Sequence, residues 1–301
     1  MAENNSEVNM MPEEKKGFRK AYFFLSFIPF AIIVAVQTAA TTPGIILAMF
    51  DIDKQGLPME IDTMMDIFNK KYAIYCYIIY CVICMAIFIP WYYKGIVKKS
   101  PKVNYKKALG IKPIVMSVSI LICLYFIVSG MFLVADKVIP SVMEQYAELM
   151  KASSLGTNIL ITVIYGYLLG PVTEELCFRG VMQGLLHKSN MSYMPVIVIQ
   201  GLLFGIMHMN LVQGVYAFIL GMILGYIRYK YKTLILSVAA HVVFNFFGTS
   251  VELLLENAGL SFFQKIIFAA VAAAIAVVLI VVVAKDKTSY IKENADTEIV
   301  S

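Results

Sequence analysis

The sequence has little charge. Only 15% of its 301 residues are charged, whereas 60% are hydrophobic, and the mean hydropathy is +0.76. Soluble domains carry about 25% charged residues, so the composition excludes an ordinary soluble enzyme. The scarcity of charge predicts that lipid solvates most of the chain.

Features of several other protein classes are also missing. The first 20 residues are polar, so we expect no cleavable signal peptide. Five cysteines lie in apolar segments, and Cys81 and Cys84 have no second pair with which to form a zinc site. We interpret all five as buried small hydrophobic residues. The net charge of +5 reflects uneven lysine placement and gives no reason to expect a nucleic-acid partner.

Long apolar runs dominate the sequence instead. Runs long enough to cross about 30 Å of hydrocarbon predict an all-α polytopic membrane protein with about eight transmembrane helices. The fifth and sixth runs are short and closely connected, so seven helices and a re-entrant hairpin are an alternative. The runs begin near residues 21, 72, 113, 158, 193, 213, 232 and 263.

Basic residues are concentrated in alternate connecting segments. If the amino terminus is cytoplasmic, most of the 25 basic residues fall in cytoplasmic segments, whereas the outer segment 51–71 is acidic. The positive-inside rule therefore predicts that both termini are cytoplasmic. We expect a multi-pass protein of the cell membrane. The cytoplasmic segments include Lys15, Lys16, Arg19, Lys20, Arg179, Lys188, Arg228, Lys230, Lys232, Lys285, Lys287, Lys292 and seven lysines from Lys94 to Lys112.

We divide the chain into five segments without repeats or linkers. Residues 140–151 have apolar positions at helical spacing, which fits a helix on the outer membrane surface or an ordinary amphipathic loop helix. Three GxxxG pairs predict close helix packing, and the polar tail is expected to be disordered. The segments are a cytosolic segment (1–20), N-terminal transmembrane helices with an acidic outer loop and a surface helix (21–154), a core (155–250), a last transmembrane helix (251–284) and a cytosolic tail (285–301).

Four ionisable residues stand within apolar helical sequence. They are the adjacent acids Glu174 and Glu175 and the histidines His208 and His241. A charged group at the bilayer centre costs about 2.5 kcal/mol or more, and such residues usually mark a functional site. A purely structural role is the competing interpretation, above all for an ion pair between Glu175 and a nearby arginine.

Several polar residues recur at a spacing of four, which places each pair on one helix face. Because neighbouring residues are about 100° apart on a helix, Glu174 should face a different neighbour from Glu175. Gly170-Pro171 is expected to break the helix just before the acids and to open a gap for water. The pairs are Glu175 with Arg179, Phe204 with His208, and His241 with Asn245.

These pairs also form three recognisable motifs. "EELCFR", "FGIMH" and "HVVFN" match the patterns EExxxR, FxxxH and HxxxN, in the order that resembles the CPBP intramembrane proteases. That family includes the type II CAAX prenyl proteases and the bacteriocin-processing and immunity proteins called Abi. The resemblance covers roughly residues 155–250. It implies an intramembrane endopeptidase of the CAAX type that acts on a membrane-associated or lipidated protein or on a peptide precursor.

The chemistry expected of such a site uses an activated water. The sequence offers no GxSxG, no serine–lysine pattern and no HExxH, and no aspartate lies in the membrane core. We therefore assign Glu174 as the base and His208 as the residue that orients the water. His241 and Asn245 are assigned to the oxyanion, and Glu175, Arg179 and Phe204 to a supporting role.

The cofactor and two other functions remain open at this point. Glu174, His208 and His241 have the chemistry of a catalytic zinc site, and the resemblance supports zinc and metal-free mechanisms alike. We favour the metal-free mechanism because His241 and Asn245 share one face. A non-catalytic membrane scaffold or bacteriocin-immunity protein is the main alternative function. A proton-coupled transporter is a third hypothesis. The expected partners are membrane lipid and a peptide or lipidated protein substrate.

Overall fold

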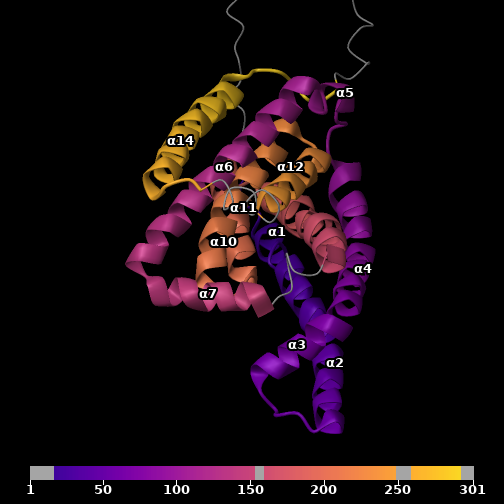
Figure 1. Ribbon diagram of the computed structural model, residues 1–301. Coiled ribbons are helices and arrows are strands. Elements are labelled where there is room, and N and C mark those ends of the chain that lie inside the picture. The colour runs from indigo at the N-terminus through magenta and orange to yellow at the C-terminus, as the bar shows by residue number, and fades with distance from the viewer. Residues whose placement is uncertain (1–16, 153–158, 249–258, 293–301) are drawn as a thin grey trace, which may run out of the picture.

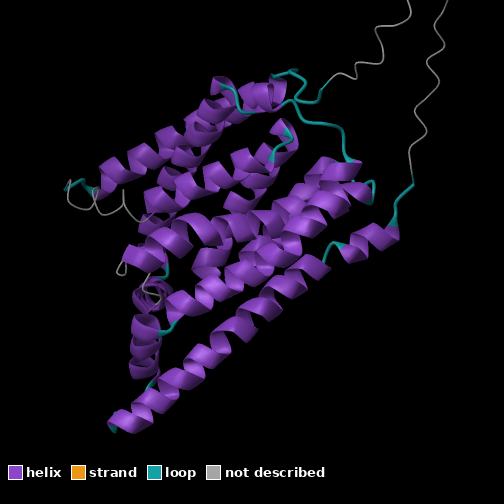
Figure 2. Cartoon of the chain, turned by 90° about the vertical axis from the view of Figure 1, so that its right-hand side faces the viewer, coloured by secondary structure: helices purple, strands orange, loops and turns teal. Residues whose placement is uncertain are grey.

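The computed structural model describes residues 17–152, 159–248 and 259–292. In these ranges the chain consists of helices that pack side by side (Figure 2), and the only extended pairing is an isolated bridge between Val103 and Ile291. The prediction of an all-α polytopic membrane protein is confirmed. Within the described ranges, five helical spans are long and apolar enough to cross a membrane: Lys20–Gln55, Ala73–Lys99, Ile111–Val138, Leu211–Tyr231 and Phe262–Lys285.

These spans are built from regular helices with local changes of geometry. The first contains α1 and α2, and Pro43 lies inside α2. The second joins α4 to a π-helix and a short 3₁₀ turn, and Pro90 lies near the end of α4. The others are single helices. The bounds are α1 Lys20–Leu25, α2 Ile28–Gln55, α4 Ala73–Trp91, η1 Tyr92–Ile96, η2 Val97–Lys99, α6 Ile111–Val138, α11 Leu211–Tyr231 and α14 Phe262–Lys285.

Two apolar helices are too short to cross the hydrocarbon core. The helix α10 is Tyr193–Met207 and has 15 residues, and α12 is Leu234–Phe246 and has 13. At a rise of 1.5 Å per residue they reach about 22 Å and 20 Å, against about 30 Å of hydrocarbon. Helical segments therefore begin close to all eight predicted positions. The helix α10 lacks the length to span fully, and α12 covers about 20 Å before the helical turn at residues 247–248, where the described range ends.

The acidic pair lies on a long helical segment that changes geometry twice. It runs from π-helix η3 (Ile161–Leu169) through α8 (Gly170–Glu175) and π-helix η4 (Leu176–Met182) to α9 (Gln183–Lys188). The expected break at Gly170-Pro171 is wrong. The Gly170 N–H donates to the Tyr165 carbonyl, five residues back, and this wider turn accommodates the proline that would disrupt an ordinary α-helix.

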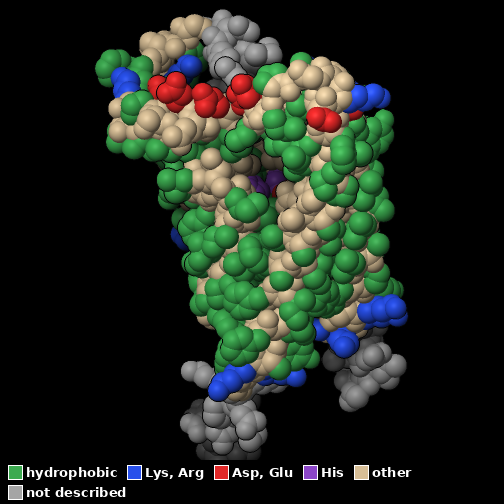
Figure 3. Space-filling model, turned by 90° about the horizontal axis from the view of Figure 1, so that it is seen from below, with side chains coloured by type: hydrophobic (Ala, Val, Ile, Leu, Met, Phe, Trp, Pro, Cys, Tyr) green, Lys and Arg blue, Asp and Glu red, His purple; other side chains and the backbone are tan. Residues whose placement is uncertain are grey.

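Acidic side chains gather at one end of the molecule and basic ones line the other, with a broad hydrophobic belt between them (Figure 3). At the acidic end, the segment predicted as an outer loop is largely helical, because α2 continues to Gln55 and α3 covers Ile61–Lys71. The predicted helix at 140–151 is confirmed as α7 (Pro140–Ala152), which runs across the end of α6 (Figure 1).

Both ends of the described chain are hydrogen-bonded to other segments at the basic end. The Arg19 N–H donates to the Ser189 carbonyl at 2.9 Å, and the Lys292 N–H donates to the Lys102 carbonyl at 2.8 Å. Tyr290 is only 4% exposed. The first part of the tail, through residue 292, is therefore ordered against the bundle, contrary to the prediction of disorder. Residues 293–301 lie outside the described ranges.

Glycines allow α10 and α11 to pack at backbone contact, as the GxxxG pairs predicted. A Cβ atom on Gly205 would lie 2.5 Å from the Gly214 carbonyl oxygen, and one on Gly221 would lie 2.9 Å from the Gly201 Cα. Real Cβ atoms do not approach backbone this closely. Any larger residue at either position would push apart α10, which ends just before His208, and α11.

We predict that Gly205→Ala lowers the free energy of unfolding by about 1–3 kcal/mol, because an added methyl group overpacks this contact. Gly248→Ala is the matched control, since a Cβ at Gly248 meets no described residue within 4 Å. Unfolding of both variants in detergent, followed by circular dichroism, compares them. Equal stability of the two variants would contradict the close-packing interpretation.

Candidate active site

Three rows of polar or aromatic side chains face the centre of the bundle. Each row has one member every four residues, and each comes from a different helical segment. The rows are Glu175, Arg179 and Gln183 on the segment from α8 to α9; Gln200 and Phe204 on α10 with His208 directly after it; and Ser237, His241 and Asn245 on α12.

Glu175 is the most completely enclosed of these residues. Its carboxylate has 0% exposure, and its Oε1 atom lies 2.8 Å from the Arg179 guanidinium, whose side chain is also 0% exposed. The same Oε1 lies 3.1 Å from Nδ1 of His241, and Oε2 accepts a short hydrogen bond from the Ser237 hydroxyl. The predicted ion pair between Glu175 and Arg179 is confirmed. Three partners on two helical segments thus compensate one buried charge.

His241 stands between the two acids. Its Nδ1 faces Glu175, and its Nε2 lies 3.7 Å from Oε2 of Glu174. The two acids therefore share one imidazole, whereas the sequence had indicated that they would face different neighbours. The separation of 3.7 Å is too long for a direct hydrogen bond. The Glu174 side chain is 14% exposed, so this is the acid that a substrate or water can reach.

Phe204 connects the arginine to both histidines. Its ring is fully buried, and the Arg179 guanidinium lies over it at 4.3 Å, a cation–π distance. The Phe204 ring centroid lies 5.1 Å from that of His208 and 5.7 Å from that of His241, in edge-to-face geometry. His208 follows the last residue of α10 and is half-buried. The FxxxH and HxxxN motifs are thus joined through one aromatic ring.

Asn245 contacts the helical segment that carries the acids. Its Nδ2 donates to the Gly166 carbonyl in π-helix η3 at 2.9 Å. A π-helix places backbone carbonyls differently from an α-helix, and such segments are frequent at functional sites. Asn245 therefore holds α12 against η3, one turn beyond the contact between His241 and the acids. If the Asn245 amide also binds an oxyanion, it must do so while Nδ2 keeps its hydrogen bond to the Gly166 carbonyl.

The motifs and charged residues of the sequence did not identify three polar residues that continue the rows. Ser237 bonds to Glu175, Gln183 donates to the Gly225 carbonyl at 2.9 Å, and Gln200 donates to the Gly221 carbonyl at 2.8 Å. All three side chains are buried. Their spacing of four from the motif residues is the signal that would have found them. None of them carries a charge, so a search for costly ionised groups passed over them.

The metal alternative can be compared with the placement of the donor groups. Within the described ranges, no group of three or more His, Cys, Asp or Glu side chains is placed to hold a metal ion. Glu174 and Nε2 of His241 approach one another, and the contact of Nδ1 with Glu175 is one that a zinc-bound histidine also makes. In the described part of the chain, however, His208 does not join these two residues as a third donor.

The comparison with protein families identifies the segment that holds this site. Residues 156–247 match the model described as type II CAAX prenyl endopeptidase Rce1-like. The chain carries an Rce1-like domain. No curated protein and no solved structure matches the chain. All three polar rows lie inside the Rce1-like domain, which begins within the segment that precedes η3 and ends at the last residues of α12.

The Rce1-like domain defines the general activity, which is that of a CAAX-type endopeptidase within the membrane. Its polar rows are enclosed by apolar helices that form the hydrophobic belt. In Figure 3, histidine atoms are visible at the bottom of a hollow in the upper part of this belt. The domain therefore presents imidazole to a hollow that opens through the lipid-facing surface.

We predict that Arg179→Ala lowers the free energy of unfolding by about 3–5 kcal/mol, because it leaves Glu175 buried without its cation. Arg179→Lys should cost less, since it keeps the charge. The double variant Glu175→Gln/Arg179→Ala should recover part of the loss, because neither buried charge remains. Thermal unfolding in detergent provides the measurement. If Arg179→Ala and Arg179→Lys unfold at the same temperature, the ion pair does not stabilise the fold.

Proposed function

We propose that this protein is an intramembrane endopeptidase in which Glu174 activates water for hydrolysis of a peptide bond. The observation that carries this assignment is the pair of groups formed by Glu174 and Nε2 of His241, 3.7 Å apart. A separation slightly beyond direct hydrogen bonding suits two groups that share a water molecule. Glu174 is also the acid with residual exposure, whereas Glu175 is fully enclosed.

In the proposed reaction, Glu174 takes a proton from water while the water oxygen attacks the scissile carbonyl carbon. The tetrahedral intermediate then collapses, and the C–N bond breaks. Glu174 returns its proton to the departing amine nitrogen. One product ends in a carboxylic acid and the other begins with an amine. The proton of the acid then passes to the amine, which gives a carboxylate and an ammonium group, so atoms and charges balance.

His241 acts beside Glu174 by holding the same water through Nε2. Its orientation is fixed by the bond between Nδ1 and Glu175, which is fixed in turn by Arg179 and Ser237. This arrangement favours His241 over His208 as the residue that orients water. His208 then polarises the scissile carbonyl and stabilises the oxyanion. Asn245 positions η3 and α12 around the cleavage site through Gly166.

The substrate class follows from the surroundings of the site. Apolar side chains cover most of the belt in which the hollow of Figure 3 opens, so a peptide that approaches through the belt first leaves bulk water. A chain that is already membrane-embedded or lipidated does so at little cost. We therefore propose a membrane-associated or lipidated protein or peptide precursor as the substrate, in keeping with the Rce1-like domain.

We predict that Glu174→Gln and His208→Ala each reduce kcat by 100-fold or more, because one removes the base and the other an oxyanion donor. Glu60→Gln, which changes an exposed glutamate at the start of α3, is the matched control. The assay uses purified protein in liposomes, with a prenylated CAAX peptide in one arm and an unmodified transmembrane peptide in the other. Full activity of either site variant on a cleaved peptide would overturn its catalytic assignment.

Folding controls distinguish catalysis from structure in this experiment. Both site variants should insert and unfold within about 1 kcal/mol of the wild type, since neither Glu174 nor His208 has an ion pair or hydrogen bond at direct bonding distance in the described structure. A parallel loss of activity and folded protein would favour a purely structural role. Cleavage of the prenylated peptide alone would identify lipid as part of the recognised substrate.

We also predict that the purified, active enzyme contains well under one equivalent of zinc and keeps its activity after chelator treatment. The reason is that His208 does not join Glu174 and His241 as a third donor among the described residues, whereas the 3.7 Å between Glu174 and Nε2 of His241 suits a shared water. Elemental analysis before and after dialysis against chelator provides the measurement. Stoichiometric zinc that is lost together with activity, followed by recovery on adding zinc, would contradict the metal-free mechanism.

A further inference from the structure

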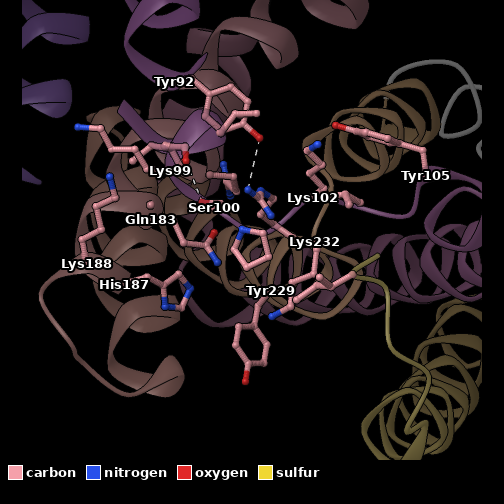
Figure 4. A pocket seen from close by; sticks show the side chains of 18 of the residues that line it. Tyr92, Lys99, Ser100, Lys102, Tyr105, Gln183, His187, Lys188, Tyr229 and Lys232 are labelled. Atoms are coloured by element: carbon pink, nitrogen blue, oxygen red, sulfur yellow. Dashed lines mark hydrogen bonds between the residues drawn. The ribbon is translucent and has the colours of Figure 1, made fainter. Parts of the chain in front are cut away.

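A second cavity lies at the basic end of the bundle. It has a volume of about 560 Å³, and Arg179 and Gln183 of the central rows form part of its wall. Figure 4 shows labelled lysines that reach it from several segments of the chain. No described residue that lines it is acidic. The basic side chains that line it, in addition to Arg179, are Lys99, Lys102, Lys188, Arg228, Lys232 and Lys292.

These six peripheral cations have no counter-charge in the described part of the chain. The acid–base pairs found there involve other residues. Arg228 bonds through Nη2 to the Tyr92 hydroxyl at 3.3 Å, and its buried Nε has no hydrogen-bond partner among the described residues. The buried Oε1 of Gln183 is likewise unpaired. Six like charges around one cavity repel one another unless an anion binds between them.

Lys232 occupies this wall with an unusual backbone. It follows the last residue of α11 at φ +61°, in the left-handed region that glycine normally occupies at the end of a helix. Burial, followed by the neighbouring charges of Arg228 and Lys230, lowers the pKa of its ammonium. Strain and a poorly solvated charge at the same position point to a function rather than to a freely solvated lysine.

The cavity is also placed where lipid headgroups lie. It opens at the end of the bundle at which the positive-inside rule predicts the cytoplasm. Its lining includes Tyr92, Tyr105 and Tyr229, and tyrosines are enriched at the membrane–water interface. Apolar side chains from Ile96 and Val103 complete the wall. A basic pocket between transmembrane helices on this side suits an anionic headgroup.

We propose that this cavity binds the phosphate group of an anionic lipid from the cytoplasmic leaflet. The phosphate lies among Lys188, Arg228 and Lys232, which are the half-buried cations, and the acyl chains leave along the apolar outer surface. The cavity shares Arg179 and Gln183 with the central rows, but Lys188, Arg228 and Lys232 lie outside those rows, so the proposal does not depend on whether the protein cleaves peptides.

The test measures how lipid changes the thermal unfolding of the full-length protein in detergent. Phosphatidylglycerol should raise the unfolding temperature in a saturable way, whereas phosphatidylcholine should not. In Arg228→Gln/Lys232→Gln, the apparent affinity for phosphatidylglycerol should fall roughly thirtyfold, at about fivefold per cation. The charge-preserving variant Arg228→Lys/Lys232→Arg should keep most of the affinity for phosphatidylglycerol. That result would show that the loss in the glutamine variant is due to the removed charge.

The matched control is Lys285→Gln/Lys287→Gln, which removes the same charge from exposed positions that do not line the cavity. It should bind phosphatidylglycerol as the wild type does. An equal loss of affinity in both neutral variants would mean that the lipid responds to the general surface charge, and would overturn the pocket. The absence of any response in the wild type would also overturn it.

Two further arms identify the source of the anion. If pyrophosphate stabilises the wild type as strongly as lipid does, the cavity takes a soluble phosphate, and the lipid assignment is wrong. The variant Glu293→Gln/Asp296→Asn/Glu298→Gln neutralises the acids that follow Lys292 in the sequence. It should respond to lipid as the wild type does. A lipid response that appears only in this variant would show that the chain's own tail occupies the cavity.

Discussion

The fully buried carboxylate of Glu175 is the constraint on which the central arrangement depends. A lone charge in this position would be unfavourable by several kcal/mol, so the fold surrounds it with Arg179, Ser237 and His241. Meeting that requirement fixes α12 against α8 and orients the imidazole. Glu174, the preceding residue in the chain, then needs no direct ion pair of its own to fix the position of its helix. The structure separates an enclosed acid, Glu175, from a partly exposed acid, Glu174, to which the proposed mechanism assigns the reaction.

The backbone of α11 serves as the common surface for the three polar rows. Its carbonyls accept hydrogen bonds from Gln183, Gln200 and Ser237, one residue from each row. The glycines of α10 and α11 make this approach sterically feasible. Helix packing and the hydrogen bonds of the buried polar groups therefore depend on each other. A wider spacing between α10 and α11 would break the hydrogen bonds of the glutamines as well as the apolar contact between the helices.

Much of this organisation could be predicted because it depends on local periodicity and on the high cost of charge in lipid. The apolar runs gave the helices, and the spacing of four gave the pairing of Glu175 with Arg179. The shared contact of both acids with His241 depends on how separate helices pack, which no local pattern contains. Proline at 171 indicated a break, but the π-helical turn before it removed the clash. Ser237 could not be identified in the same way, because burying a neutral hydroxyl costs much less free energy than burying a charged group.

The short helices α10 and α12 carry a consequence for the bilayer itself. At about 22 Å, α10, which ends just before His208, leaves a hydrophobic mismatch with the surrounding lipid, and α12 is about 20 Å long within the described residues. Acyl chains next to them must tilt, compress or yield to water. The depth to which water penetrates is then set by the thickness of the host membrane as well as by the protein. A bilayer with longer acyl chains, or one made more rigid by sterols, would alter the hydration of the site without any change in the protein sequence.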